Sequence, residues 1–124
     1  MLNVPKALLE PCVKKETLHR SGKRLLLEIA GALELSTECY DIRSSKGGNG
    51  VMGEVILHSD HLYLMVHVMT SELRVMYRTC KGQKDYSGGI NHFVGVSELA
   101  SATASERFIS KLKQMTSLGI REVA

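Results

Sequence analysis

Residues 51–80 read VMGEVILHSDHLYLMVHVMTSELRVMYRTC and carry apolar side chains at every second position through most of their length. A period of two is typical of β-strands, because successive side chains of a strand point to opposite faces of the sheet. Turn-forming residues interrupt the run at 59–60 and at 70–72. The stretch therefore predicts three strands joined by short turns, over residues 51–58, 61–69 and 73–80.

Another strand is predicted before these three. The helical period of the earlier residues ends near Thr37, and residues 39–43 are expected to form the first strand. The segment 44–50 contains three glycines and an asparagine, which adopt turn conformations at low cost. Consecutive strands with short connections form an antiparallel meander, so we expect a four-stranded antiparallel sheet.

An N-terminal helix is predicted over residues 15–35, where apolar and small residues recur at spacings of three and four. They are Leu18, Gly22, Leu25, Ile29 and Leu33. Each helical glycine costs about 1 kcal/mol relative to alanine, and Gly31 is expected to allow close packing on the sheet. Residues 1–14 contain two prolines and predict one turn of helix or an irregular arm.

A second helix is predicted near the C-terminus. The sequence Thr103-Ala-Ser-Glu106 fits a capping box, and apolar residues follow at helical spacing. Gly119 is placed where a left-handed C-terminal cap is expected. The order of helix, strands, long loop and helix predicts an α+β fold of two layers, with the four-stranded meander against both helices, in a single domain over residues 1–124.

Two helices cover roughly one face of a four-stranded sheet, yet the second face also carries apolar side chains. They are predicted to be Met52, Ile56, Tyr63, Met65, Met69 and Met76. Methionine is adaptable and common at binding surfaces. We therefore expect a homodimer or a docked protein partner on this face. The alternative is that residues 1–14 and the loop after Cys80 fold over it.

Composition is that of an ordinary globular protein, with 44% hydrophobic and 23% charged residues. The net charge of +3 permits contact with nucleic acid but falls short of a strongly basic binder. The three cysteines, Cys12, Cys39 and Cys80, are widely spaced and form no CxxC, which favours a reducing cytoplasm. No secretory signal and no apolar run long enough to span a bilayer is recognised.

The segment 77–93, YRTCKGQKDYSGGINHF, is the predicted working surface, because loops carry function more readily than the framework does. Basic and aromatic side chains together bind single-stranded nucleic acid by stacking and phosphate contact. A protein-binding loop has the same composition, since Tyr and Arg are common interface anchors. The candidate binding residues are Tyr77, Arg78, Lys81, Lys84, Asp85, Tyr86, Asn91 and His92.

Three patterns could carry chemistry, although none is assigned a catalytic residue, metal or cofactor. Cys80 with Asp85 and His92 could form a nucleophile set, or Cys80 could be a structural thiol. His58 and His61 could begin a metal site, with further ligands from Cys80, His67 or His92, or could stack as cross-strand neighbours. The glycine-rich segments 46–50 and 87–89 could hold an anion, but a meander places them at opposite ends of the sheet.

The run from Val75 to Phe93, VMYRTCKGQKDYSGGINHF, resembles small uncharacterised proteins of bacterial phages and mobile elements. The resemblance implies a bacterial accessory protein and carries over no activity or site. We therefore expect a non-enzymatic small binding protein that acts through a macromolecular partner. A nucleic-acid-binding protein that uses residues 77–93 is the alternative, and a small metal-dependent or Cys-dependent enzyme is the third hypothesis.

Overall fold

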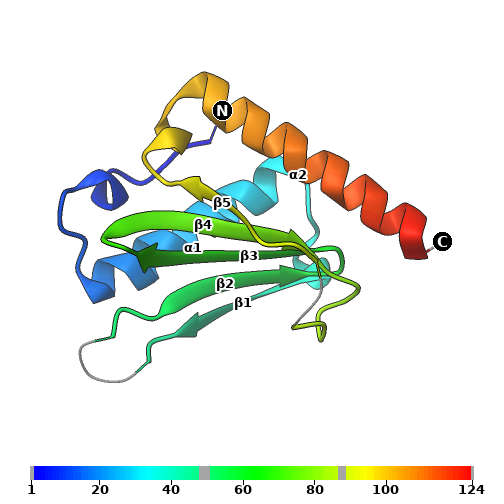
Figure 1. Ribbon diagram of the computed structural model, residues 1–124, viewed down its shortest axis with the longest axis horizontal. Helices are drawn as coiled ribbons and strands as arrows, with labels where there is room; N and C mark the ends of the chain where they lie inside the picture. The colour runs from blue at the N-terminus through cyan, green and yellow to red at the C-terminus, as the bar shows by residue number, and fades with distance from the viewer. Residues whose placement is uncertain (1, 48–50, 87–88, 124) are drawn as a thin grey trace.

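The computed structural model describes residues 2–47, 51–86 and 89–123, with side chains up to Thr116, and its strands form one antiparallel sheet (Figure 1). The spatial order of the strands is the same as their order along the chain, so the predicted meander and α+β class are confirmed. The strands are β1 (Tyr40–Ser45), β2 (Glu54–Ser59), β3 (Leu62–Met69), β4 (Glu72–Thr79) and β5 (His92–Gly95).

The sheet has five strands, whereas four were predicted. The additional strand, β5, begins inside the segment that was predicted to be a loop, and it pairs with β4 through Tyr77 opposite His92 and Met76 opposite Phe93. Four residues contain too few alternations to show a period of two. Only the pairing with β4 makes this segment a strand.

Both helices pack on one face of the sheet, which we call the covered face. Figure 1 shows α1 (Lys15–Ala32) behind the strands, whereas α2 (Ala102–Val123) runs along the β5 side. A Cβ added at Gly22 would lie 3.4 Å from side-chain atoms of Val55 and Val66, so α1 approaches β2 and β3 closely. Short 3-10 turns complete the fold: η1 (Lys6–Leu9), η2 (Thr37–Cys39) and η3 (Glu98–Ala100).

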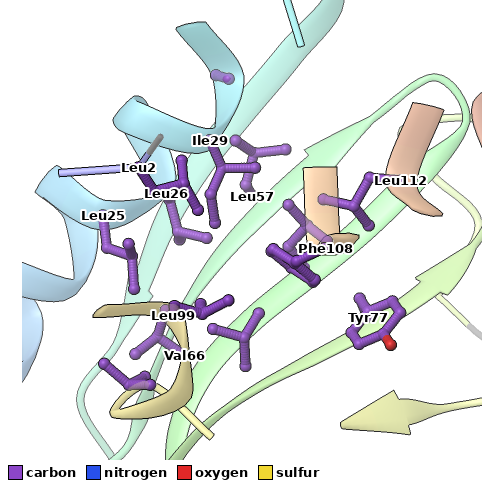
Figure 2. Close-up of a cluster of buried hydrophobic side chains, with 14 of the residues drawn as sticks. Leu2, Leu25, Leu26, Ile29, Leu57, Val66, Tyr77, Leu99, Phe108 and Leu112 are labelled. Atoms are coloured by element: carbon purple, nitrogen blue, oxygen red, sulfur yellow. The ribbon is translucent and has the colours of Figure 1, made fainter. Parts of the chain in front are cut away.

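The main core lies between the covered face and the helices, as Figure 2 shows. The contributing side chains are Leu25, Leu26 and Ile29 of α1, Leu57, Val66 and Tyr77 of the sheet, Leu99 of η3, and Phe108 and Leu112 of α2. Full burial of one such side chain contributes roughly 1.5–3 kcal/mol. The N-terminal arm joins this core through Leu2 and Leu8, and the Leu2 backbone N–H donates to Ser105 Oγ at 2.7 Å.

The helix boundaries differ from the predicted ones. The hydroxyl group of Ser101 accepts a hydrogen bond from the backbone N–H of Ala104 at 3.4 Å, so α2 begins before Thr103 and the predicted capping box does not form. The helix also continues past Gly119. In α1 it is Gly22 that approaches the sheet, whereas nothing lies within 4 Å of a Cβ added at Gly31.

Candidate functional site

The face of the sheet opposite the helices, here called the open face, carries side chains in rows across the strands. No helix among the described residues packs on it, since both helices contribute to the core of the covered face. The strand register defines the rows. The first row contains Asp41, His58, Tyr63 and Arg78; the second contains Arg43, Ile56, Met65, Met76 and Phe93; the third contains Ser45, Glu54, His67 and Arg74.

The predicted place of Met52 on this face is wrong. Gly53 has a φ of +74°, a conformation that favours glycine, so the chain leaves the extended conformation before β2 begins. The alternation of side chains therefore cannot be extended back to Met52, which packs against the main core. Its carbonyl group lies 2.8 Å from His19 Nε2 of α1.

Residues 80–86 and 89–91, between β4 and β5, lie over one end of the open face. A local turn is closed by two hydrogen bonds, from the Lys81 N–H to Asp85 Oδ2 at 3.0 Å and from the Asp85 N–H to the Gly82 carbonyl at 3.1 Å. Gln83 then donates to Asp60 Oδ1 at 3.1 Å, which ties the segment to the β2–β3 turn. As a result, the ring of Tyr86 reaches His58, with centroids 5.4 Å apart.

The two segments expected to cover this face therefore behave differently. The loop after Cys80 does lie over part of it, beside a small buried cluster of Ile56, Tyr63 and Met76. Residues 1–14 do not, because Leu2 and Leu8 belong to the core of the covered face. The rest of the open face exposes large apolar side chains, among them Phe93 and Met69, each 43% exposed.

Each of three arginines on the open face has its guanidinium group over an aromatic ring. Arg78 lies 4.2 Å from the ring centroid of Tyr63, and Arg74 lies 4.5 Å from that of Phe93. Arg43 lies 5.4 Å from that of Tyr86. Cation–π contacts of this kind contribute about 0.5–1 kcal/mol at exposed sites and more when desolvated. They hold the arginines flat against the face.

A hollow of about 300 Å³ lies between the loop and the sheet. Its lining combines aromatic, thioether, amide and guanidinium groups, from Tyr63, Met65, Met76, Arg78, Tyr86, Gly89 and Asn91. Of these side chains Arg78 is only 4% exposed, whereas Tyr86 is 63% exposed. We call this the Arg78 hollow.

His58 is fully buried beside the Arg78 hollow. Arg43 donates a hydrogen bond to His58 Nδ1 at 3.4 Å, and the edges of two tyrosine rings pack on the imidazole. Burial is the largest cause of a lowered pKa, and Arg43 and Arg78 lower it further. His58 is therefore neutral near pH 7, and Nδ1 is the nitrogen without a proton because arginine can only donate.

His58 pairs across the strands with Tyr63 and not with His61, so the expected stacking of the two histidines at the sheet edge is wrong. The turn has the predicted two residues but lies one residue further along the chain, at Asp60 and His61. The hydroxyl group of Ser59 closes it by accepting from the Leu62 N–H at 2.9 Å. Within the described residues, no group of three or more His, Cys, Asp or Glu side chains is arranged to hold a metal ion.

Cys80 has the environment of a structural thiol. It is 5% exposed, and its Sγ donates to the carbonyl of Ser59 at 3.2 Å. Burial raises the pKa of the thiol, which disfavours the thiolate that a nucleophile requires. These observations favour the structural interpretation of Cys80 over the catalytic one.

The sheet separates the predicted binding residues. Arg78, Tyr86 and Asn91 line the Arg78 hollow on the open face. Lys81 and Lys84 are exposed in the loop beside it, whereas Asp85 is half-buried there. Tyr77 and His92 lie on the covered face, where their rings stack with centroids 5.3 Å apart and Tyr77 also contacts Phe108.

Sequence reasoning missed Arg43 as a member of this site. The feature that places Arg43 on the open face is its cross-strand pairing with Ile56, and this pairing cannot be predicted from the sequence of one strand alone. The prediction that the β1–β2 turn and the β4–β5 loop lie at opposite ends of the sheet is confirmed (Figure 1). Residues 48–50 and 87–88 of the two glycine-rich segments lie outside the described residues.

Comparisons with known proteins identify no relative of this chain. No protein-family model matches the chain, and no curated protein or solved structure is significantly similar to it. In the part of the chain that the structure describes, neither helix combines the length and apolar character needed to cross a bilayer. The functional argument therefore depends on the open face itself.

Proposed function

We propose that this chain is a non-enzymatic binding protein that docks a protein partner on the open face. The observation that carries the proposal is the exposure of Phe93 and Tyr86, each with an arginine over its ring, on a sheet face that both helices leave uncovered. Aromatic and arginine side chains are the residues most often found at the energetic centres of protein interfaces.

The exposed apolar groups are better explained by a partner than by the fold. Phe93 and Met69 are 43% exposed although the main core is closed, so a large part of each apolar side chain is left in contact with water. A symmetric pair of open faces would bury them in an isologous dimer, the commonest oligomer. A second copy of the chain is therefore the first partner to test, and a pull-down from the source cell would test others.

The test replaces one exposed apolar side chain on each side of the molecule. Phe93→Ser changes the open face, and Leu27→Ser changes an equally exposed side chain of α1. Sedimentation of the wild type at micromolar concentration should give twice the chain mass. Phe93→Ser should weaken association at least tenfold, whereas Leu27→Ser should leave it unchanged. Equal effects of both changes, or a monomeric wild type that also captures nothing through this face, would contradict the proposal.

Nucleic-acid binding is the second candidate, favoured by the three arginines on aromatic rings and by two exposed lysines in the adjoining loop. If a single-stranded oligonucleotide is the ligand, Lys81→Ala with Lys84→Ala should weaken binding across all sequences and lower the salt dependence of the affinity. Lys14→Ala with Lys23→Ala, two exposed lysines of the N-terminal part, is the matched control. No binding of any oligonucleotide near physiological salt leaves the protein partner as the remaining candidate.

The biological setting that we propose is based on the resemblance of residues 75–93 to small proteins of bacterial phages and mobile elements. A small accessory protein of a bacterial phage or mobile element, acting in the cytoplasm, would need a binding surface and no reaction of its own. The burial of the Cys80 thiol and its raised pKa argue against Cys80 as a nucleophile. Metal analysis of the purified protein tests the remaining enzymatic hypothesis.

A further inference from the structure

We propose that the outer edge of β1 pairs in antiparallel fashion with the same edge of a second copy of the chain, here called the partner. The inference goes beyond the proposed function, because it concerns an edge of the sheet and not its open face. In the described part of the chain, β1 lies at one end of the strand order and pairs only with β2. Its outer edge therefore presents backbone N–H and C=O groups with which a further strand can pair.

This edge is accessible along β1. Among the described backbone groups, no hydrogen bond joins residues 40–45 to a segment other than β2. The side chain of Asp41 is 55% exposed, and Ser44 and Ser45 are exposed as well. Figure 1 shows β1 along the lower margin of the sheet, on the side away from α2.

The charges along this strand complement those of an antiparallel copy. Asp41 and Arg43 both lie on the open face, one on each side of Ile42. When Ile42 is opposite the partner's Ile42, Asp41 is opposite the partner's Arg43, and Arg43 is opposite the partner's Asp41. Glu38 precedes the strand and Lys46 follows it, so opposite charges also approach each other at the two ends. A parallel copy in register would bring like charges together instead.

The same charges select one antiparallel register. A pair centred on Asp41 or on Arg43 would place two carboxylates or two guanidinium groups directly opposite each other, which is destabilising. The pair centred on Ile42 instead joins two ion pairs, since Asp41 and Arg43 of one chain are 3.5 Å apart. Charged side chains on an edge strand usually discourage association. In β1 their order favours one partner strand in one register.

The covered face accommodates this pairing. Ile42 is half-buried against the main core, and the partner's Ile42 would pack beside it. Because α1 packs over β2 and β3 and neighbouring strands are about 4.8 Å apart, the two copies of α1 would lie roughly 20 Å apart. That separation is about two helix diameters, so the helices would not collide. The pairing would form one continuous sheet with both open faces on the same side.

The experiment traps the pair as a disulfide under mild oxidation, because one pair of short strands buries too little surface for strong association. The full-length chain carries Phe93→Ser, which is expected to weaken association through the open face. Cys12→Ser and Cys39→Ser remove the two thiols that are not buried. Ile42→Cys is then introduced. Directly opposite residues of an antiparallel pair have Cα atoms about 4.5–5.5 Å apart, which a disulfide can span.

Ile42→Cys should cross-link at least tenfold faster than Ser44→Cys in the same background. Ser44 lies on the same face and is more exposed than Ile42, so random collision would favour the control. In the proposed register the two copies of residue 44 are offset by roughly 13 Å along the strands. Equal rates at the two positions would overturn the inference. If Ile42→Cys fails to cross-link while Phe93→Ser abolishes association of the natural chain, the proposed function stands and only this inference is lost.

Charge reversal tests the register. Added to the Ile42→Cys chain, Asp41→Arg or Arg43→Asp gives both positions the same charge, so each variant alone should cross-link at least tenfold more slowly. A mixture of the two variants should recover cross-linking between unlike chains, because every arginine then faces an aspartate. Loss of folding in either variant cannot produce this recovery. Absence of recovery between two folded variants would overturn the inference.

A second measurement covers the possibility that Arg43→Asp does not fold, since Arg43 also donates to His58. Added salt should speed the cross-linking of the Asp41→Arg variant, because it screens the repulsion between like charges. Cross-linking of that variant that is as fast as in the Ile42→Cys chain at low salt, or that salt does not change, would contradict the proposed pairing.

Discussion

His58 is a titratable residue that the fold buries without an acidic hydrogen-bond partner among the described contacts. Its ring contacts Arg43, Tyr63 and Tyr86, an environment that disfavours a positive charge. Burial lowers the pKa below the ordinary value of 6.5, and Arg43 and Arg78 act in the same direction, whereas the Gly82 backbone and Asp85 oppose them. The folded chain therefore takes up a proton less readily than the unfolded chain does.

This difference predicts the pH dependence of stability. Well above pH 6.5 the residue is neutral in both states and contributes no pH dependence. As the pH falls below 6.5 the unfolded chain gains a proton that the folded chain resists, so the free energy of unfolding decreases. His58→Gln removes this titration. Urea unfolding at pH 7.5 and 5.5 should show a smaller loss of stability in the variant than in the wild type.

His67 provides the comparison. Burial and Arg74 lower the pKa of His67 as well, so His67→Gln should also reduce the loss of stability at pH 5.5. The effects of the two changes should be nearly additive, because the residues lie in different rows of the open face. An unchanged pH dependence in His58→Gln would show that its burial does not control protonation.

The two glycines of α1 have opposite environments, which the sequence does not distinguish. A Cβ at Gly31 meets nothing within 4 Å, so Gly31→Ala should raise the free energy of unfolding by about 0.5–1 kcal/mol through a less flexible unfolded chain. At Gly22 a Cβ already touches Val55 and Val66, and a leucine has no room there. Gly22→Leu should therefore cost about 1–3 kcal/mol by overpacking.

Urea unfolding of both variants tests this prediction, and equal stability changes would contradict it. The contrast between the two glycines also shows which structural features can be predicted from the sequence of a single helix. The apolar spacing in α1 predicts a helix, because that spacing is a property of the element alone. The choice between Gly22 and Gly31 depends on where the helix crosses the sheet, which is a property of the pair of elements.

In the strands, too, some features can be predicted from one element alone and others depend on a neighbouring element. Alternation predicted the faces of β3 and β4, where runs of eight residues are uninterrupted. It failed at Met52, because the positive φ of Gly53 ends the alternation, and it failed to show β5, which is a strand only through its pairing with β4. The same limit applies to the candidate site. The composition of residues 77–93 predicted a binding segment, but only the fold shows that Tyr77 and His92 lie on the covered face and Arg78 on the open face.

In the whole molecule the two sheet faces are closed by different means. The covered face is buried by two helices and the N-terminal arm, whereas in the described part of the chain only residues 80–86 and 89–91 lie across one end of the open face. The described contacts between that segment and the open face include polar and aromatic ones, among them Gln83 with Asp60, and Tyr86 with His58 and Arg43. Segments with few buried apolar contacts open at low free-energy cost. We therefore expect the cover over Ile56, Tyr63 and Met76 to open more readily than the helices on the covered face.

Removing this cover should convert buried apolar surface into an interface. Replacing residues 82–90 with Asn-Gly leaves a five-residue connection, residues 80 and 81, Asn-Gly and residue 91, which is long enough to join β4 and β5 while Tyr77 stays opposite His92. The shortened chain should expose the cluster of Ile56, Tyr63 and Met76 and should self-associate at lower concentration than the wild type, as light scattering would show. Adding Phe93→Ser to the shortened chain should reverse the association, because the same face is involved. A shortened chain that associates no more strongly than the wild type would mean that the loop is not what keeps this cluster from a partner.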